Sequence, residues 1–496
     1  MADPRSGAVD PVPTPRTNLL GVDLYLEVRG RGLRAGLIDA LREAVRTGRL
    51  APGVRLPPSR SFAADLGIAR STVSAAYTEL VAEGWLTARQ GSGTRVAKRV
   101  EARRTALAPQ QAAPTVHRPA YSLLTGMPNL AEFPRGQWLA CARRALGAAP
   151  HEAFALGDAL GRVELRTALA EYLARARGVY ADPGRIVICS GFHHGLKLIA
   201  QALHARGVRS VAVESYGLDL YRRQLTSAGL RTPLLDVDEH GARVADLEGL
   251  EGVGAVLLTP AHQFPTGVAL HHDRRAAAVD WARAGDWLVL EDDYDGEFRY
   301  DRQPVGALQG LDPERVVYFG TVSKSLAPGL RLAWMVLPEA LVAEVVAAKG
   351  GLDWVSSALD QLTLAEFIAS GAYDRQVRLM RQHYRRRRDQ LVSALARRAP
   401  GVRVSGIAAG LQAVLELPPG SERSVIEAAG REDLAVSGLA EFRHEAPPGQ
   451  SAGPGRDALV VNFAAPLESA WAGALEALCR AMPTGGQVAR GVLPGR

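Results

Sequence analysis

Apolar residues near the N-terminus recur at the spacing of α-helices. The stretch LRAGLIDALREAVRTGRL places five of them on one helical face, Leu33, Leu37, Ile38, Leu41 and Val45, and ends at Gly48. A short second helix is expected between Ser59, as its N-cap, and Gly67, as its stop. A third helix would bury Val73, Ala76, Tyr77 and Leu80. Two short helices around a glycine-containing turn predict a helix-turn-helix.

The third helix would present a polar first turn to solvent, made of Arg70, Ser71, Thr72 and Ser74. In a helix-turn-helix, residues at this position meet base edges in the major groove. The next stretch, WLTARQGSGTRVA, predicts two strands around Gly91, Ser92 and Gly93, a basic turn suited to phosphate or minor-groove contact. The pattern predicts a winged helix-turn-helix that binds double-stranded DNA. The alternative is a winged helix that serves only protein contact.

Beyond residue 120, short apolar runs alternate with helical patterns: RIVICS, SVAVES, GAVLLTP, WLVLEDD and RVVYFG. This alternation is typical of an α/β domain with a mostly parallel sheet. The predicted organisation is a flexible N-terminus over 1–19, a winged helix over 20–98, a linker over 99–119, an α/β domain over 120–482 and a flexible tail over 483–496.

The composition agrees with this division. The chain has 496 residues, more than one core usually supports, and 47% of them are hydrophobic. Residues 1–104 hold 17 Lys and Arg against 10 Asp and Glu, and the remaining residues hold 42 against 42. The whole net charge of +7 therefore belongs to the first fifth of the chain, as expected of a part that meets a polyanion.

The three cysteines, Cys141, Cys189 and Cys479, are far apart and show no spacing typical of a metal site or a disulfide framework. The first residues lack an apolar segment of signal-peptide length, and no run approaches 18 uncharged apolar residues. These features predict a cytoplasmic protein with buried thiols.

Three stretches of the α/β domain carry candidate chemistry. GTVSKSLAPGLRL surrounds the amine of Lys324 with Thr321, Ser323, Ser325 and Arg331, groups that suit a phosphate dianion. WLVLEDDYDGEFRY places Asp292 and Tyr294 two residues apart, on one face of a strand. VICSGFHHGLKL leads from a strand into a helix, so the amides of Gly191 and Phe192 can hold a phosphate. A site for pyridoxal 5'-phosphate needs an amine that forms a Schiff base, an acid that pairs with the pyridinium, a phenol for the ring oxygen and a phosphate cradle.

The chain resembles known families in these stretches. GRLAPGVRLPPSR, LGIARSTVSAAYTELVAEGWL and GSGT resemble the GntR-type winged helix, and the resemblance assigns DNA contact to Arg60, Arg70, Ser71, Thr72, Gly91, Ser92, Gly93 and Thr94. TPAHQFPTGVAL, LEDDYDGEFRY, GTVSKSLAPGLRL and SGAYDRQVRLMRQHYRRRRDQL are similar to the MocR family, which joins such a reader to a fold-type I aminotransferase-like domain.

The MocR resemblance also implies roles for site residues. Lys324 would form the internal aldimine with pyridoxal 5'-phosphate, Asp292 would pair with the pyridine nitrogen, and Tyr294 would bind the ring oxygen. The phosphate cradle would consist of Gly191, Phe192, Thr321, Ser323 and Arg331.

The sequence departs from aminotransferases at four positions. Phe264 replaces the amide of an NPTG turn, and Leu156 replaces a tyrosine that would reach a neighbouring subunit. Leu218 stands where an aromatic ring is usual, although Tyr216 is close by. Val460 occupies the position of the arginine that grips a substrate carboxylate, which a valine cannot do. The candidate replacements for that arginine are Arg222, Arg443 and Arg456.

The leading hypothesis is a homodimeric transcription regulator that responds to pyridoxal 5'-phosphate, alone or with an amine, and controls genes of vitamin B6 supply. The first alternative is an active aminotransferase with an appended DNA-binding domain. The second is a DNA-binding protein whose large domain only dimerises. The basic stretch from Arg385 to Arg388 is interpreted as a solvated helix face or dimer contact rather than a second DNA site.

Overall fold

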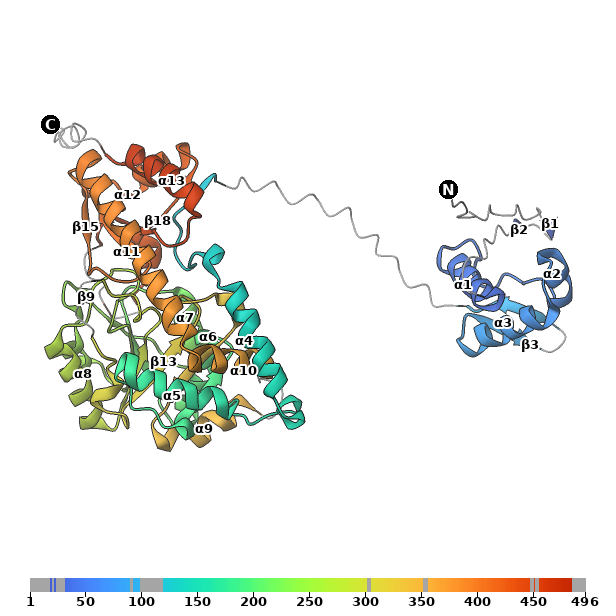
Figure 1. Cartoon of the computed structure of the whole chain (residues 1–496), viewed down its shortest axis with the longest axis horizontal. Helices are drawn as coiled ribbons and strands as arrows, with labels where there is room; N and C mark the ends of the chain where they lie inside the picture. Colours follow the sequence, from blue (N-terminus) through green and yellow to red (C-terminus); the bar gives the residue numbers. More distant parts are fainter. Residues whose placement is uncertain are drawn as a thin grey trace, which may run out of the picture. The chain divides into compact units, whose positions relative to one another are not determined.

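The computed structural model describes residues 32–89, 92–98, 119–300, 305–350, 356–446, 450 and 455–483, together with two short paired strands, β1 (Asn18–Leu19) and β2 (Val22–Asp23). The chain divides into two compact units, Met1–His117 and Arg118–Arg496 (Figure 1). The predicted lead-in, linker and tail lie almost entirely outside the described residues. No helix within the described ranges is long and apolar enough to cross a membrane.

The N-terminal unit is the predicted winged helix-turn-helix. Its helices are α1 (Leu33–Arg46), α2 (Ser59–Leu66) and α3 (Arg70–Ala82), and its wing strands are β3 (Leu86–Arg89) and β4 (Gly93–Val96). Helix α3 packs against both α1 and α2, and β3 pairs antiparallel with β4. The core collects Leu37, Ile38, Leu41, Val73, Ala76, Tyr77 and Leu80. The helices predicted from apolar periodicity are therefore present.

Three details of this unit differ from the sequence predictions. Leu33 is 60% exposed, because it is the first residue of α1 and lies beyond the packed face, and Val45 is only partly buried. Ser59 is not an N-cap: Pro58 occupies that position with φ −55°, and no side chain caps the helix. Gly67 ends α2 as predicted, in the left-handed conformation with φ 66°.

The larger unit is built on a seven-stranded sheet in the order β6-β14-β13-β12-β11-β7-β8. All five predicted strands are present, as β6 (Ile186–Cys189), β7 (Ser210–Glu214), β11 (Val253–Leu258), β12 (Leu288–Asp292) and β13 (Val316–Thr321). The apolar pattern did not predict β8 (Leu234–Leu235) or β14 (Ala333–Val336). Strands β8, β7, β11, β12 and β13 are parallel neighbours, and β14 runs antiparallel to β13 and β6.

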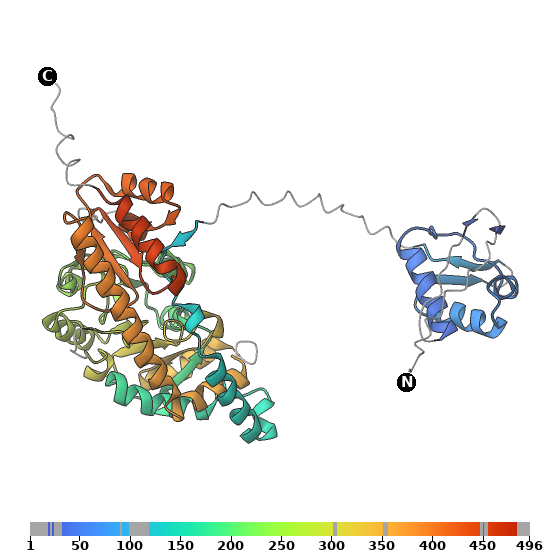
Figure 2. The ribbon, with the colours of Figure 1, turned by 45° about the horizontal axis from the view of Figure 1, so that its top comes forward.

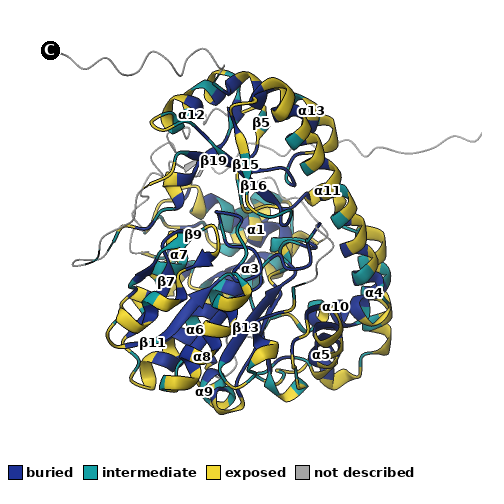
Figure 3. Cartoon of the chain, turned by 90° about the vertical axis from the view of Figure 1, so that its left-hand side faces the viewer, coloured by how far each residue is buried: buried dark blue, intermediate teal, exposed yellow. Residues whose placement is uncertain are grey.

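Helices cover both faces of this sheet, which explains its continuous apolar runs (Figure 3). One face packs against α6 (Phe192–Ala205), α7 (Asp219–Ser227) and α9 (Glu339–Lys349). The other packs against α5 (Val163–Arg177), α8 (His272–Gly285) and α10 (Ala358–Ala369), with α4 (Arg135–Ala148) lying on α10. The prediction of a mostly parallel α/β domain is confirmed.

A smaller antiparallel sheet completes the unit, in the order β15-β16-β19-β18. Its strands are β15 (Arg403–Ser405), β16 (Gln412–Glu416), β18 (Ser437–Gly438) and β19 (Ala458–Asn462). Helices α12 (Glu422–Arg431) and α13 (Glu468–Ala481) share its core. Two further pairs are β5 (Tyr121–Ser122) with β17 (Leu434–Ala435), and β9 (Val237–Asp238) with β10 (Gly241–Ala242).

The long helix α11 (Ala372–Arg398) runs along the unit, drawn in orange in Figure 2. It carries the basic stretch, whose members have different environments. Arg385 and Arg386 are exposed, whereas Arg387 is fully buried and donates to the carbonyl oxygens of Phe463, Ala464 and Pro466. Arg387 is therefore no part of a solvated face, because it holds the segment that leads into α13.

Candidate functional site

A cavity of about 180 Å³ lies at the carboxyl ends of the parallel strands. Ligands of open α/β sheets bind at this edge, because the loops after several strands converge there. Asp292, Tyr294 and Lys324 all line the cavity, so the structure brings together the three side chains that the sequence singled out. The other lining residues are Thr125, Gly126, Val213, Glu214, Tyr216, Gly217, Leu218, Tyr221, Arg222, Leu257, Thr259, Phe264, Leu411, Gln412 and His444.

Lys324 follows β13 and reaches into the cavity. Its Nζ donates to the carbonyl oxygen of Gly126 at 2.5 Å. Burial lowers the pKa of Lys324, and the negative charges of Asp295 and Asp292 oppose this effect. A lower pKa enlarges the fraction of neutral amine, the form that attacks a carbonyl carbon.

Asp292 is the last residue of β12 and is buried. Burial raises the pKa of Asp292 well above its usual range, repulsion from Asp293 and Asp295 adds to the rise, and Lys324 counteracts it. A cation beside this carboxyl would reverse the rise. The protonated ring nitrogen of pyridoxal 5'-phosphate is such a cation, so the Asp292 environment fits the cofactor.

Tyr294 reaches the same cavity from the loop, not from the strand. The predicted shared strand face is wrong, because β12 ends at Asp292. The Tyr294 hydroxyl accepts a hydrogen bond from Nε2 of Gln412 at 2.9 Å and lies 3.1 Å from Nδ1 of His262. Asp292 and Tyr294 therefore face the same cavity because of the loop conformation after β12, and not because they alternate along a strand.

Three of the five residues expected to cradle a phosphate, Gly191, Phe192 and Arg331, meet at the first turn of α6. Gly191 is the N-cap of α6 with φ 102°, and the Arg331 guanidinium donates to the carbonyl oxygen of Ser190. A Cβ on Gly191 would lie 2.9 Å from Cζ of Arg331, so a glycine is needed for this approach. Helix N-terminal amides beside a guanidinium suit a dianion.

Two hydroxyls lie at the end of β13. Thr321 Oγ1 and Ser323 Oγ are 2.8 Å apart, and the Thr321 hydroxyl also accepts from the Ser323 amide. Ser325 does not join them: its side chain is buried and lies 2.8 Å from the hydroxyl of Tyr373. Phe192 contributes its backbone to the turn, while its ring packs on Tyr221 and Phe319.

Sequence reasoning missed several cavity residues. The clearest is Glu214, the last residue of β7, whose carboxylate accepts from Thr259 Oγ1 at 2.6 Å and from Gln263 Nε2 at 3.3 Å. Burial raises the pKa of Glu214 to about 7. A signal existed, because an acid at a strand end is what drew attention to Asp292. Gln412 and His444 gave no such signal, since they lie far along the chain in stretches without a motif.

The four departures from aminotransferases have different settings. Val460 is fully buried in an apolar cluster with Tyr216, Val414, Leu439, Phe442 and Ala458, against which Phe264 packs. Leu156 is 71% exposed, and Leu218 lines the cavity. The place of the carboxylate-binding arginine is therefore apolar.

Arg222 is the one of the three candidate replacements that lines the cavity. Its guanidinium already donates to Thr232 Oγ1 and to the carbonyl oxygen of Glu445, at 3.0 and 2.7 Å. Arg456 lies over the ring of Tyr216, with 6.0 Å between Cζ and the ring centroid. Arg443 is half-buried and forms a β-bridge with Tyr216.

In the N-terminal unit, most of the predicted DNA-contact residues are accessible. Arg60, Arg70, Ser71, Ser92 and Gly93 are exposed, and Thr72 and Thr94 are half-buried. Gly91 lies outside the described residues. Sequence reasoning missed Arg55, Arg89 and Arg95, which are exposed on or beside the wing strands. Arg55 packs so closely on Gly93 that a Cβ there would lie 3.0 Å from its Nε.

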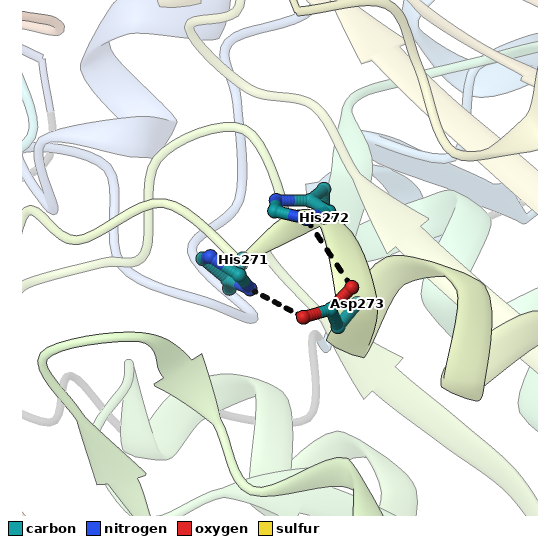
Figure 4. Close-up of side chains that lie close together, drawn as sticks. All are labelled: His271, His272 and Asp273. Atoms are coloured by element: carbon teal, nitrogen blue, oxygen red, sulfur yellow. Dashed lines mark ion pairs between the residues drawn. The ribbon is translucent and has the colours of Figure 1, made fainter.

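An exposed cluster at the start of α8 carries residue types that bind metals (Figure 4). Nδ1 of His271 lies 3.5 Å, and Nε2 of His272 lies 3.2 Å, from the carboxylate of Asp273. His272 and Asp273 have side chains that are 80% and 78% exposed. Exposed pairs of this kind form without an ion, and none of the three residues lines the cavity.

Comparison with known proteins matches both units. Residues 33–96 match the family of bacterial regulatory proteins of the gntR type, and residues 132–446 match class I and II aminotransferases. The pyridoxine biosynthesis transcriptional regulator PdxR of Corynebacterium glutamicum is 32% identical, over 82% of this chain and 88% of that protein. The probable rhizopine catabolism regulatory protein MocR of Rhizobium meliloti is 31% identical, over 84% and 88%.

Among solved structures, a kynurenine aminotransferase of Pyrococcus horikoshii superposes with a TM-score of 0.65 at 25% identity, covering 74% of this chain and 91% of that one. The larger unit thus has the fold of pyridoxal 5'-phosphate-dependent aminotransferases, and the predicted cofactor is confirmed at this level. The chain belongs to the MocR family of HTH-type transcriptional regulators, in which a GntR-type DNA-binding domain is joined to an aminotransferase-like domain.

Proposed function

We propose that this regulator senses pyridoxal 5'-phosphate itself, which binds in the cavity and changes how the chain binds DNA. The observation that carries the proposal is the contrast between two parts of the site. Lys324, Asp292 and Tyr294 converge on one cavity, whereas the place of the carboxylate-binding arginine is occupied by buried Val460. The site is equipped for the cofactor and poorly equipped for an amino acid.

Each residue has a defined task in this proposal. Lys324 attaches the cofactor through its amine, Asp292 holds the protonated ring nitrogen, and Tyr294 binds the ring oxygen. The amides of Gly191 and Phe192, the hydroxyls of Thr321 and Ser323, and Arg331 hold the phosphate. When bound, the cofactor supplies an electron sink for amine substrates.

Turnover should nevertheless be slow or absent. Positioning of a substrate can supply about 7–11 kcal/mol of a reaction barrier, and a buried valine contributes none of the bidentate contact that an arginine would make. Arg222 is the candidate replacement that lines the cavity, but its guanidinium already donates hydrogen bonds to the Thr232 hydroxyl and the Glu445 carbonyl oxygen. This part of the proposal is tested by measuring how fast a panel of amino acids converts the aldehyde form of the cofactor to its amine form. Rapid conversion would contradict it.

The regulated genes are proposed to serve vitamin B6 supply. PdxR, the relative from Corynebacterium glutamicum, is named for control of pyridoxine biosynthesis, and the two chains align over most of their lengths. A regulator of such genes that responds to their end product needs no further ligand.

DNA footprinting with and without the cofactor tests the sensing proposal. The footprint or the affinity should change on addition of pyridoxal 5'-phosphate alone, and candidate amines added afterwards should have little further effect. A footprint that ignores the cofactor but changes with an amino acid would overturn the proposal in favour of an amino acid sensor.

We further propose that the protein acts as a homodimer. Large apolar side chains are exposed along residues 124–163, namely Leu124, Met127, Leu130, Leu139, Leu146, Phe154, Leu156 and Val163. Exposed apolar residues concentrated in this way are typical of protein interfaces. Two copies would present two DNA readers, matching repeated half-sites in an operator.

A further inference from the structure

The Tyr294 hydroxyl has two protein neighbours in the cavity wall. Gln412, the first residue of β16, directs its amide nitrogen Nε2 at the hydroxyl oxygen from 2.9 Å. Nδ1 of His262 lies 3.1 Å from the same oxygen. Gln412 and His262 are both buried, so water does not compete freely with these contacts.

Neither neighbour can accept the Tyr294 proton. The amide nitrogen of a glutamine carries hydrogens and no free lone pair. Nδ1 of His262 lies 2.8 Å from Oδ2 of Asp295, and because a carboxylate only accepts, Nδ1 must carry the hydrogen of that bond. The Tyr294 oxygen therefore accepts from Gln412 and donates to neither neighbour, since the Nδ1 hydrogen of His262 is directed at Asp295.

Packing holds the His262–Asp295 pair in place. Gly410, two residues before Gln412, passes so close that a Cβ there would lie 2.5 Å from Nδ1 of His262 and 2.5 Å from Oδ2 of Asp295. The backbone at Gly410 also has φ 68°, which favours glycine. The segment that leads into β16 thus packs against the His262–Asp295 pair at Gly410 and places Gln412 beside Tyr294.

The hydroxyl proton has a competing acceptor in the protein, the carboxylate of Asp295. Burial raises the pKa of Tyr294, Asp295 raises it further through its charge and through a side-chain hydrogen bond, and the charge of Asp292 adds to the rise. Oδ2 of Asp295 already accepts from His262, and the Tyr294 side chain lines the cavity. An anionic oxygen in the cavity would compete with Asp295 for the proton, and Tyr294 can reach both.

We propose that Gln412 is a positioning residue that, together with the His262–Asp295 pair, fixes Tyr294 as a hydrogen-bond donor to an anionic oxygen in the cavity. The inference rests on the proposed function, in which that oxygen is the ring oxygen of pyridoxal 5'-phosphate. A donor stabilises negative charge on this oxygen. The charge is greatest when the lysine–cofactor linkage has lost its proton, so the donor lowers the pKa of the bound chromophore.

Replacement of Gln412 tests this role in the full chain. In Gln412→Met, which keeps the length of the side chain, the pKa of the bound chromophore, measured from its visible absorption, should rise. Affinity for pyridoxal 5'-phosphate should fall about two- to tenfold, as expected for one lost hydrogen bond. Gln412→Glu, which offers an acceptor and draws the Tyr294 proton away from the cavity, should raise the chromophore pKa further.

Gln376→Met is the control for the structural effect of removing a buried side-chain amide. Gln376 is 5% exposed, against 6% for Gln412, and donates to the carbonyl oxygen of Glu132 at 3.0 Å, outside the cavity wall. This variant should leave the chromophore pKa unchanged. If Gln412→Met does not fold, Gln412→Asn, which shortens the side chain by one methylene, provides the same comparison.

The decisive comparison uses Tyr294→Phe. If Gln412 acts through the hydroxyl, adding Gln412→Met to Tyr294→Phe should change neither the pKa nor the affinity further. A shift of equal size in both backgrounds, or no shift in either, would overturn the inference while leaving the proposed function intact. A wild-type protein without a cofactor absorption band would overturn both.

Discussion

At the scale of single residues, the site depends on what burial does to a few ionisable groups. Burial lowers the pKa of Lys324 and raises that of Asp292 well above its usual range. Both shifts bring the two groups toward neutrality. A cofactor that links to the amine and brings a cationic ring nitrogen would suit both groups at once.

Replacing Lys324 should abolish covalent capture of pyridoxal 5'-phosphate. In Lys324→Ala the visible absorption of the lysine-bound cofactor and the adduct trapped by borohydride should both disappear, since the amine is the attacking group. Lys349→Met is the matched control: burial lowers the pKa of Lys349 too, but its Nζ donates to the carbonyl oxygens of Ala159 and Ile188. A trapped adduct that survives in Lys324→Ala would show that another lysine carries the cofactor.

Glu214 should make the stability of the cofactor-free protein depend on pH. Its pKa is raised from 4.5 to about 7 by burial, so the folded state binds the proton more tightly than the unfolded state. The resulting stabilisation is complete below the unfolded pKa and is lost as pH rises through about 7. In Glu214→Gln the free energy of unfolding should therefore fall less between about pH 5 and about pH 8.

Denaturant titrations across this pH range measure the Glu214 effect. Part of the pH dependence of the free energy of unfolding should remain in Glu214→Gln, because burial also raises the pKa of Glu291 and Glu297 to about 7. Exposed Glu445 provides the control, and Glu445→Gln should keep the wild-type slope. Equal slopes in wild type and Glu214→Gln would mean that Glu214 is not protonated in the folded state.

At the scale of elements, both proposed binding regions include a helix N-terminus. Gly191 begins α6 beside Arg331 in the larger unit, and Arg70 begins α3 in the N-terminal unit. A helix N-terminus presents unpaired backbone amides and a partial positive charge, which favour phosphate oxygens. The same backbone property is thus proposed to serve the cofactor phosphate in one unit and DNA in the other.

Gly191→Ala should weaken cofactor binding beyond its cost in stability. The φ of 102° strains any side chain by about 1–3 kcal/mol, and the new Cβ would also displace the Arg331 guanidinium. Gly207→Ala separates the two effects, because Gly207 has φ 91° and a Cβ at that position would have no atom within 4 Å. Calorimetric titration should show weaker binding in Gly191→Ala alone, and equal affinities in the two variants would contradict the cradle.

Arg70→Ala should lower specific DNA affinity by about 1–3 kcal/mol if Arg70 reads a base, and should leave cofactor binding intact. Arg46→Ala is the control, since Arg46 is exposed in the last turn of α1 and pairs with Glu43. Binding is measured on the operator and on unrelated DNA at one salt concentration. An equal loss on both DNAs would make Arg70 a phosphate contact, and no loss would exclude α3 as the recognition helix.

At the scale of the whole molecule, the proposed function requires that cofactor binding in the larger unit affect a separately folded DNA reader. The two units have their own cores, formed around α1–α3 in one and around the two sheets in the other. A cofactor can shift DNA binding only as far as it binds two arrangements of the protein with different affinity. A homodimer supplies such arrangements through the spacing of its two readers.

A charged residue on α4 should weaken the proposed dimer. Leu139 and Leu146 are seven residues apart on α4 and are 58% and 52% exposed, so Leu139→Glu would place a charge in an apolar patch. Sedimentation should show a smaller species at the same protein concentration. Leu311→Glu changes a residue of similar exposure beside α8, which Figure 1 draws on the other side of the unit, and should sediment like wild type.

The apolar pattern predicted the two folded units, the helices and wing of the reader and five strands of the large sheet, and the motifs pointed to three residues that line the cavity. Periodicity revealed α1, α3 and five strands because apolar spacing is a local property. Asp292, Tyr294 and Lys324 stood out because they lie at or just beyond the end of a strand. The groups that surround these residues could not be predicted in this way, because Glu214, His262 and Gln412 come from distant segments that only folding brings together. The tertiary structure also turned Ser325 away from the cavity and buried Arg387, because packing rather than residue type selects the partner of each polar group.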